Sequence, residues 1–275
     1  MGKVFAVLFR FVFKIPFLKG TYFGFHKRFF KPYNIFEGTI KTVSFQNVKF
    51  ELHIEDWIQQ NIYFVGAYER AELNLLNRHL SENSVFVDIG ANFGLYSLVA
   101  SQKITNSGKI ICFEPFPKNY AALKKNISLN GISYITSENI ALGDKKDELS
   151  LYYQPTEKNL GMVSANFMEN SKIIEVDVMS FDEYVNENGI DKIDFIKIDV
   201  EGFENQVIMG MKKTLELFSP MILIEIFDES SKNSNNHNAH NYLTRIGYSK
   251  YFIDDFGNLS SENTNPNRKN YFYKK

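Results

Sequence analysis

A short apolar segment followed by glycines constrains the fold of this chain more than any other feature. Residues 85–89, Val-Phe-Val-Asp-Ile, are rich in β-branched side chains, which is typical of a buried strand. Asp88 lies at the end of this strand, and Gly90 and Gly94 follow before a helical apolar pattern begins at Leu95. A strand, a glycine-rich turn and a helix in this order predict an α/β protein that binds a ligand at its first βα loop.

The acid before the glycines narrows the class of ligand. A carboxylate is a poor neighbour for a pyrophosphate, and the spacing of Gly90 and Gly94 does not fit the Gly-x-Gly-x-x-Gly motif of dinucleotide-binding proteins. The turn favours a ligand with a cationic portion instead. Glycine suits such a turn because it tolerates positive φ and lets the backbone approach a ligand closely. An ordinary βα turn without a ligand is the alternative interpretation of this segment.

The composition is that of a globular protein with little net charge. The 275 residues carry a formal net charge of −1, and 44% of them are hydrophobic, which is enough for one large α/β core. A near-zero charge does not indicate nucleic acid as a partner. The one cysteine, Cys112, cannot form a disulfide within one chain, which is consistent with a reducing, cytoplasmic location.

The charge is unevenly distributed along the chain. Residues 1–34 form a basic, aromatic N-terminal extension with seven Lys or Arg and no Asp or Glu. No stretch in it approaches the roughly 20 apolar residues that span a bilayer. One interpretation is an amphipathic segment that lies in a membrane interface and gives peripheral contact. The other is a helix packed on the domain with its basic face in solvent, and nucleic-acid binding is a weaker third.

Two further segments are expected after the extension. Residues 35–80 should form a hairpin and a helix, because alternating runs at 39–45 and 48–54 flank the two-residue connection Gln46-Asn47. Apolar residues at helical spacing predict the helix over 69–80. Residues 81–275 then form the ligand-binding domain.

Predicted strands and helices alternate after the glycine turn. Strands are expected at 109–114, 134–141, 149–153, 173–178, 193–199 and 221–227, and helices at 120–129, from 181, and from 204 to about 218. Apolar strands separated by helices predict a doubly wound, mostly parallel sheet. The last predicted strands, 248–253 and 271–273, would add an antiparallel pair.

Acidic residues gather at the predicted carboxyl ends of these strands, which is where such sheets bind ligands. Glu114 follows Gly90 at close to the roughly 20-residue offset at which an acid accepts hydrogen bonds from ribose hydroxyls. Phe116 lies between two prolines and is free to pack on a flat base. The acids at strand ends are Asp88, Glu114, Asp144, Asp199, Glu201 and Glu225.

Five motifs occur in a fixed order: DIGANFG at 88–94, FEPFP at 113–117, ALGD at 141–144, IKIDVEGFE at 196–204 and ILIE at 222–225. Over about residues 62–252 the chain resembles the FkbM family of S-adenosylmethionine-dependent methyltransferases. The resemblance implies a class I methyltransferase (Rossmann-like) fold, with a mostly parallel seven-stranded sheet whose last strand is reversed. It also implies O-methylation of a hydroxyl on a saccharide or related polyol.

The resemblance implies S-adenosylmethionine as the cofactor, and this fits the acidic turn because the sulfonium and the α-amino group are both positive. Asp88 would face the amino-acid portion, and Glu114 would accept from the ribose hydroxyls. Asn92 would hydrogen-bond the methionine carboxylate or would simply form the turn. The expected cofactor-binding residues are Asp88, Gly90, Asn92, Gly94, Glu114, Phe116, Ala141 and Leu142, the last three beside the adenine.

Methyl transfer to a neutral hydroxyl calls for a general base or a metal, because an alcohol is a weak nucleophile. We expect a base rather than a metal site. Asp199 is the first choice and Glu201 the second, with Glu225 and Glu72 behind them. The alternative for each is a carboxylate that binds a helix N-terminus or a buried lysine such as Lys197.

Two other functions stay open from the sequence. A nucleotide-dependent oxidoreductase of the same fold is disfavoured by Asp88 and by the absence of Gly-x-Gly-x-x-Gly. A non-catalytic S-adenosylmethionine-binding module is weakly disfavoured by the acids at 199, 201 and 225. The sequence specifies neither the acceptor nor the oligomeric state.

Overall fold

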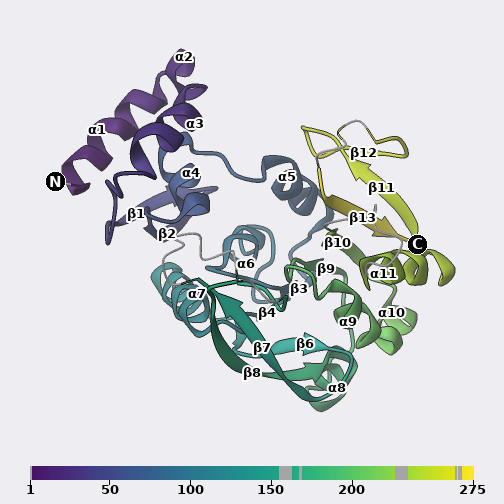
Figure 1. The fold of residues 1–275 in the computed structure, drawn as a ribbon. Helices are drawn as coiled ribbons and strands as arrows, with labels where there is room; N and C mark the ends of the chain where they lie inside the picture. The colour runs from purple at the N-terminus through teal and green to yellow at the C-terminus, as the bar shows by residue number, and fades with distance from the viewer. Residues whose placement is uncertain (1, 155–162, 167–168, 227–234, 264, 266–267) are drawn as a thin grey trace. The chain divides into compact units, whose positions relative to one another are not determined.

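The structure is a computed structural model, and it describes residues 2–154, 163–166, 169–226, 235–263, 265 and 268–275 (Figure 1). The described residues fall into two compact units, 2–69 and 70–275. The boundary between the units lies after Glu69, whereas the segments expected from the sequence end at residues 34 and 80. The helix expected at 69–80 therefore belongs to the second unit, and the hairpin to the first.

The first unit begins with helices and continues with a hairpin. Its helices are α1 (Gly2–Lys14), α2 (Pro16–Lys19), α3 (Tyr22–Phe25), a π-helix (His26–Phe30) and α4 (Trp57–Val65). The predicted hairpin is confirmed, with β1 (Ile40–Phe45) antiparallel to β2 (Val48–His53). Gln46 and Asn47 both have positive φ, 50° and 61°, as a tight two-residue turn requires.

Helix α4 was not expected from the sequence, although its start carries a clear signal. The Asp56 carboxylate accepts a hydrogen bond from the Gln59 N–H at 2.9 Å, which caps the helix. Helix α4 packs against α1 around an aromatic core. This core contains Phe13, Tyr22, Phe30, Phe36 and Phe64.

A mostly parallel sheet organises the second unit (Figure 1). Its strands are β3 (Val85–Ile89), β4 (Lys109–Phe113), β5 (Ile135–Glu138), β9 (Phe195–Ile198), β10 (Met221–Glu225), β11 (Ser249–Ile253), β12 (Leu259–Ser260) and β13 (Asn270–Lys274). They lie in the order β12-β11-β13-β10-β9-β3-β4-β5. Strands β10, β9, β3, β4 and β5 pair in parallel, and β13 is antiparallel to both β10 and β11.

The predicted sheet with a reversed last strand is confirmed. The described residues form eight strands in it rather than seven, because the two-residue β12 pairs with β11 at one edge. Strand β10 ends at Glu225, and Phe227, the last residue of the predicted strand, lies outside the described residues. The described helices of this unit are α5 (Arg70–His79), α6 (Leu95–Ala100), α7 (Pro117–Asn130), α8 (Phe181–Glu187), α9 (Glu204–Met209), α10 (Lys212–Phe218) and α11 (Asn235–Arg245).

The single helix expected from 204 to about 218 is wrong. The structure has two helices, α9 (Glu204–Met209) and α10 (Lys212–Phe218). The chain breaks at Gly210, where a Cβ would lie 1.8 Å from the backbone oxygen of Gly143. A close approach of two backbones, invisible in the helical pattern, ends the first helix there.

The single strand expected over 134–141 is also wrong. It divides into β5 in the main sheet and β6 (Ala141–Gly143), which joins β7 (Asp147–Tyr153) and β8 (Lys172–Ser180) in a separate three-stranded sheet. At the division, the Asn139 side chain donates to the carbonyls of Glu114 and Pro115 at 2.8 and 2.9 Å. This side chain holds the connection at the end of β4 while the chain leaves the main sheet.

Candidate functional site

The carboxyl ends of the parallel strands bring several expected site residues into one cross-strand row. Ile89 of β3 lies opposite Phe113 of β4 and Ile198 of β9, and Ile198 lies opposite Ile224 of β10. The residues that directly follow these four are Glu114, Gly90, Asp199 and Glu225, in a row along the strand ends. We call this row, with the loop at 90–94 and the acids at 199–204, the carboxyl edge.

Gly90 is required by the neighbouring strand. It has φ of 77°, and a Cβ there would lie 1.8 Å from the backbone oxygen of Asp199. The Asp199 N–H in turn donates to the Ile89 carbonyl at 3.0 Å. Gly94, with φ of 93°, is closed in by the Leu123 side chain of α7, 2.6 Å from a Cβ position. Both glycines therefore serve close packing within the protein, in addition to any clearance for a ligand.

Asp88 is enclosed behind the loop. Its side chain is 0% exposed, and Oδ2 accepts from the Ser97 N–H at 3.1 Å and the Ser97 hydroxyl at 2.5 Å. Burial raises the pKa of Asp88, opposed by the Lys197 charge and by Ser97. The expected contact of this carboxylate with the amino-acid portion of a cofactor stays a prediction, since Oδ1 is buried without a hydrogen-bond partner among the described residues and lies 3.6 Å from the Lys197 ammonium. The geometry gives Asp88 the task of holding the first turn of α6.

Lys197 links the two halves of the carboxyl edge, which are the glycine loop after β3 and the acids after β9. Its buried ammonium lies 3.6 Å from Asp88 Oδ1 and 3.3 Å from Asp199 Oδ2, and it donates to the Gly90 carbonyl at 2.9 Å. It also lies 5.1 Å from the centre of the Tyr96 ring. The sequence suggested Lys197 only as a partner for an acid. The sequence signal for these additional contacts was a lysine inside the otherwise apolar strand 195–198.

Glu114 fixes the loop from the other side. Its buried carboxylate accepts from the Asn92 N–H at 2.7 Å through Oε2 and from the Phe116 N–H at 3.0 Å through Oε1. Burial raises the pKa of Glu114 to about 7, against these two backbone hydrogen bonds. Each oxygen keeps one further acceptor position, so the expected ribose contact needs a hydroxyl that reaches a nearly enclosed group.

Asn92 of the loop carries an acceptor atom without a hydrogen-bond partner among the described residues. Its φ is 52°, which Asn tolerates better than most residues. Its Oδ1 is buried and has no hydrogen-bond partner within the described part of the chain. A buried acceptor without a partner is costly, so this atom marks a place that a donor group of a ligand fits.

The three residues expected beside the adenine are all buried. Phe116 is buried and packs on Tyr153, with ring centres 5.1 Å apart. Ala141 and Leu142 are buried in β6 of the three-stranded sheet, paired with Val178 and Met179 of β8. They thus come from a different sheet than Gly90 and Asp199.

The acids after β9 lie close enough to affect one another's protonation. The Asp199 side chain is 29% exposed. Glu201 has a positive φ of 51°, and burial together with the charges of Asp199 and Glu204 raises its pKa to about 8. Glu204 is buried and accepts from the Gly202 N–H at 2.9 Å. Glu204 was part of a motif but had no predicted role.

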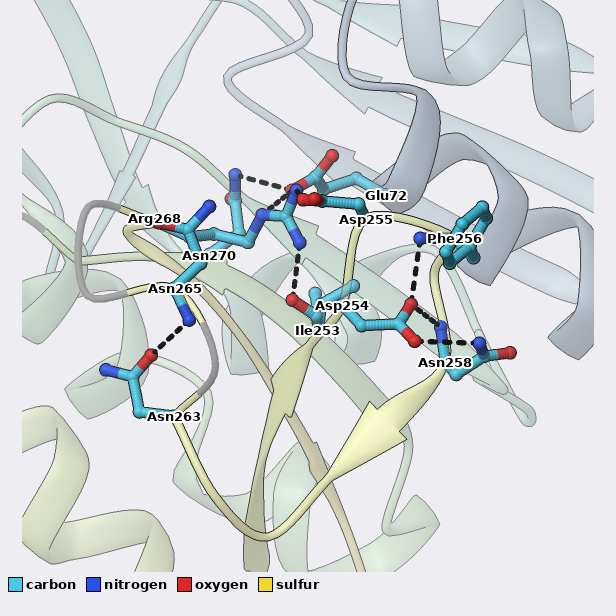
Figure 2. A network of polar contacts seen from close by, with 10 residues as sticks. All are labelled: Glu72, Ile253, Asp254, Asp255, Phe256, Asn258, Asn263, Asn265, Arg268 and Asn270. Carbon is cyan, nitrogen blue, oxygen red and sulfur yellow. Dashed lines mark hydrogen bonds and ion pairs between the residues drawn. The ribbon is translucent and has the colours of Figure 1, made fainter.

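Glu72, a weaker candidate for the base, has a structural partner. Figure 2 shows its carboxylate beside Arg268, with Nε to Oε1 at 3.2 Å. Arg268 also pairs with Asp255 at 3.1 Å. The Asn270 side chain reaches Glu72 at 3.5 Å, and in the sheet Asn270 lies opposite Glu225. This network ties α5 to the strands β11 and β13, which explains the buried acid without a catalytic role.

A mostly parallel sheet with a reversed last strand, and a glycine loop and acids at its carboxyl edge, define a Rossmann-like α/β fold of the class I methyltransferase type. Among the described residues, no group of three or more His, Cys, Asp or Glu is placed to hold a metal ion. Residues 88–250 match the family model described as the methyltransferase FkbM domain. The chain belongs to the FkbM family of methyltransferases, as the five motifs predicted.

Individual relatives share a limited part of their length with this chain. The hexuronic acid methyltransferase AglP of Haloferax volcanii is 25% identical over 158 residues, which are 58% of this chain and 62% of that protein. The 31-O-demethyl-FK506 methyltransferase FkbM of Streptomyces tacrolimicus is 24% identical over 162 residues, 48% of this chain and 61% of that protein. A solved FkbM methyltransferase structure from Methylobacillus flagellatus is 18% identical with a TM-score of 0.48, covering 81% of this chain and 54% of that one.

Proposed function

We propose that this protein transfers the methyl group of S-adenosylmethionine to a hydroxyl of a saccharide or related polyol. The cross-strand row at the carboxyl edge carries the proposal, because it sets the glycine loop directly beside Asp199. The names of two relatives support the acceptor class: one acts on a hexuronic acid, and the other is named for a 31-O-demethyl substrate.

The residues of the loop suit a cationic nucleoside. S-adenosylmethionine supplies, when bound, a methyl group on a positively charged sulfur. The buried Asn92 Oδ1 is an acceptor for an ammonium group, and the spare acceptor positions of Glu114 suit ribose hydroxyls. Asp199 adds negative charge on the other side of the loop. These groups match the positive charge and the hydroxyls of the cofactor.

Asp199 is the base in this proposal. It is partly exposed, and its contact with the Lys197 ammonium at 3.3 Å orients the carboxylate. It would accept the proton of the acceptor hydroxyl as the oxygen attacks the methyl group. Glu201 is second, because a pKa of about 8 leaves it mostly protonated at neutral pH. Glu225, one strand further along the row, is third.

The test is Asp199→Asn. We expect unchanged calorimetric affinity for S-adenosylmethionine and a fall in turnover of about 10²- to 10⁴-fold, the usual contribution of a general base. Asp191→Asn, at an exposed position before β9, is the matched control and should keep full turnover. Retained turnover in Asp199→Asn would remove Asp199 from the mechanism.

Family membership favours methyl transfer over the oxidoreductase alternative. A non-catalytic binding module would bind S-adenosylmethionine but would methylate none of a panel of saccharides. We further propose a cytoplasmic protein with peripheral membrane contact through residues 1–34. The single buried Cys112 and the basic, acid-free composition of that extension support this location.

A further inference from the structure

Exposed apolar side chains are concentrated at the start of the chain. In the described residues, eleven of the fifteen exposed large hydrophobic side chains lie between residues 4 and 33. They are Val4, Phe5, Val7, Leu8, Phe11, Ile15, Phe17, Phe23, Phe25, Phe29 and Tyr33. Single exposed apolar residues are ordinary, but a contiguous set of this kind marks an interaction surface.

Helix α1 is apolar on both of its faces. Ala6 and Phe13 point into the first unit and are buried. Val4, Leu8 and Phe11, spaced at i, i+4 and i+7, lie on the opposite face and are exposed. Arg10 and Lys14 lie on the stripe between these two faces, and Lys14 is exposed. A helix with an exposed apolar face opposite its buried one needs a second apolar environment.

The exposed charges within residues 4–33 all have one sign. Lys14, Lys27, Arg28 and Lys31 are exposed, and residues 1–34 contain no Asp or Glu. A second copy of the same surface would bring like charges together, which is unfavourable. An anionic lipid surface instead attracts each basic residue by about 1 kcal/mol.

We infer that the exposed apolar side chains of residues 4–33 and the surrounding Lys and Arg form a docking surface for an anionic membrane interface. Helix α1, with 13 residues, lies in the plane of the interface, with Val4, Leu8 and Phe11 facing the acyl chains. No helix in the described part of the chain is long and apolar enough to cross a bilayer. The inference rests on the peripheral contact proposed above and is independent of the methyl-transfer chemistry.

Vesicle sedimentation of the full chain tests this surface. We expect binding to vesicles of phosphatidylglycerol and phosphatidylcholine in equal parts, and much weaker binding to pure phosphatidylcholine. Phe11→Ser with Phe17→Ser should lower the partition coefficient about tenfold or more, since each phenylalanine loses its apolar contact. The matched control is Leu217→Ser with Phe256→Ser, because Leu217 is 73% exposed and Phe17 is 78% exposed.

The basic residues give a second, separable variant. Lys27→Gln with Arg28→Gln should weaken binding to the anionic vesicles about 25-fold, at roughly fivefold for each charge. Binding to pure phosphatidylcholine should stay unchanged. Raised salt should reduce binding of the wild type more than that of this variant. Thermal unfolding followed by circular dichroism checks that all variants keep the fold.

Three outcomes would overturn the inference. The first is that the full chain does not bind vesicles, and the second is that the Leu217 and Phe256 control loses as much binding as the Phe11 and Phe17 variant. The third is that the Phe11 and Phe17 changes convert a dimer to a monomer and leave vesicle binding unaltered. Calorimetry with S-adenosylmethionine on the same samples separates the two proposals. A protein that binds the cofactor but does not bind vesicles would contradict only the docking surface. A protein that binds vesicles but does not bind the cofactor would contradict only methyl transfer.

Discussion

The carboxyl edge has two sides, one with Asp88 and Glu114 around the glycine loop and one with Asp199 and Glu201 after β9. The two sides differ in the groups that contact their carboxylates. On the loop side, Asp88 and Glu114 are buried, and backbone N–H groups and the Ser97 hydroxyl donate to them. On the other side, Asp199 is partly exposed beside Lys197, and Glu201 has a pKa raised to about 8 by burial and by neighbouring acids. Asp88 lies within β3, opposite Cys112 of β4 and Lys197 of β9, whereas Glu114 and Asp199 each directly follow their strands.

This difference teaches that an acid in a binding motif can also hold the backbone around it. The Asp88 carboxylate accepts from the first turn of α6, and the Glu114 carboxylate accepts from Asn92 and Phe116 while each of its oxygens keeps one acceptor position. Asp199 and Glu201 instead lie close to other charged groups, Asp199 beside Lys197 and Glu201 beside Asp199 and Glu204. Lys197 contacts Asp88, the Gly90 carbonyl and Asp199 at once, so this one side chain connects the two sides of the carboxyl edge.

Gly90→Ala should give the largest effect, because it separates the two halves directly. The added Cβ would meet the Asp199 carbonyl at 1.8 Å, at a φ of 77°. We expect a loss of about 4 kcal/mol or more in the free energy of unfolding, measured by urea denaturation. Gly131→Ala is the control, since its φ is similar at 64° but no atom lies within 4 Å of the Cβ position. It should cost only about 1 kcal/mol, and equal losses in the two variants would contradict the close approach of the backbones.

Lys197→Met should give the next largest effect. It leaves the buried Asp88 carboxylate without its cation, and we expect a cost of about 3 kcal/mol. Adding Asp88→Asn should recover part of this loss, because the uncompensated charge is then gone. The Lys192 pair with Asp194 at 3.1 Å is much more exposed, so Lys192→Met should cost at most about 1 kcal/mol. Equal effects of the two lysine variants would show that Lys197 does not join the halves.

Much of the fold could be predicted from the sequence because the main strands carry local signals. The apolar runs at 85–89, 109–113 and 221–225 and the intervening helical patterns specified the parallel sheet, and Gln46-Asn47 specified the hairpin. The division of 134–141 between two sheets could not be predicted. It depends on the Asn139 contacts with the end of β4, which are tertiary. The break at Gly210 depends in the same way on the backbone of Gly143.

The candidate site was predictable in position but not in orientation. Strand ends and register place Glu114, Gly90, Asp199 and Glu225 together. Whether a side chain faces the ligand or the protein depends on what packs around it. Ser97, nine residues after Asp88, takes up that carboxylate, and Arg268, almost 200 residues after Glu72, takes up the other. Neither pairing has a local sequence signal.

The smallest of the expected effects concerns pH and sharpens the contrast between the two halves. The pKa of Glu201 in the folded protein is about 8, above its ordinary value of 4.5, so folding favours the protonated form. Its contribution to stability is therefore full at pH values below about 4.5 and is lost as the pH rises through about 8. Because Glu201 is only partly buried, solvent screening weakens the full effect of this shift, and between about pH 5 and about pH 9 the wild type should lose about 2 kcal/mol more in free energy of unfolding than Glu201→Gln.

Urea denaturation at a series of pH values measures this difference, and Glu82→Gln, at an exposed position before β3, controls for the loss of one charge. Parallel pH curves for wild type and Glu201→Gln would mean that Glu201 is not confined with Asp199 and Glu204. The turnover of the same variant assigns the reactive acid. If Asp199 is the base, Glu201→Gln keeps its activity at neutral pH. If Glu201 is the base, wild-type turnover rises as the pH passes through about 8, and the variant does not show that rise.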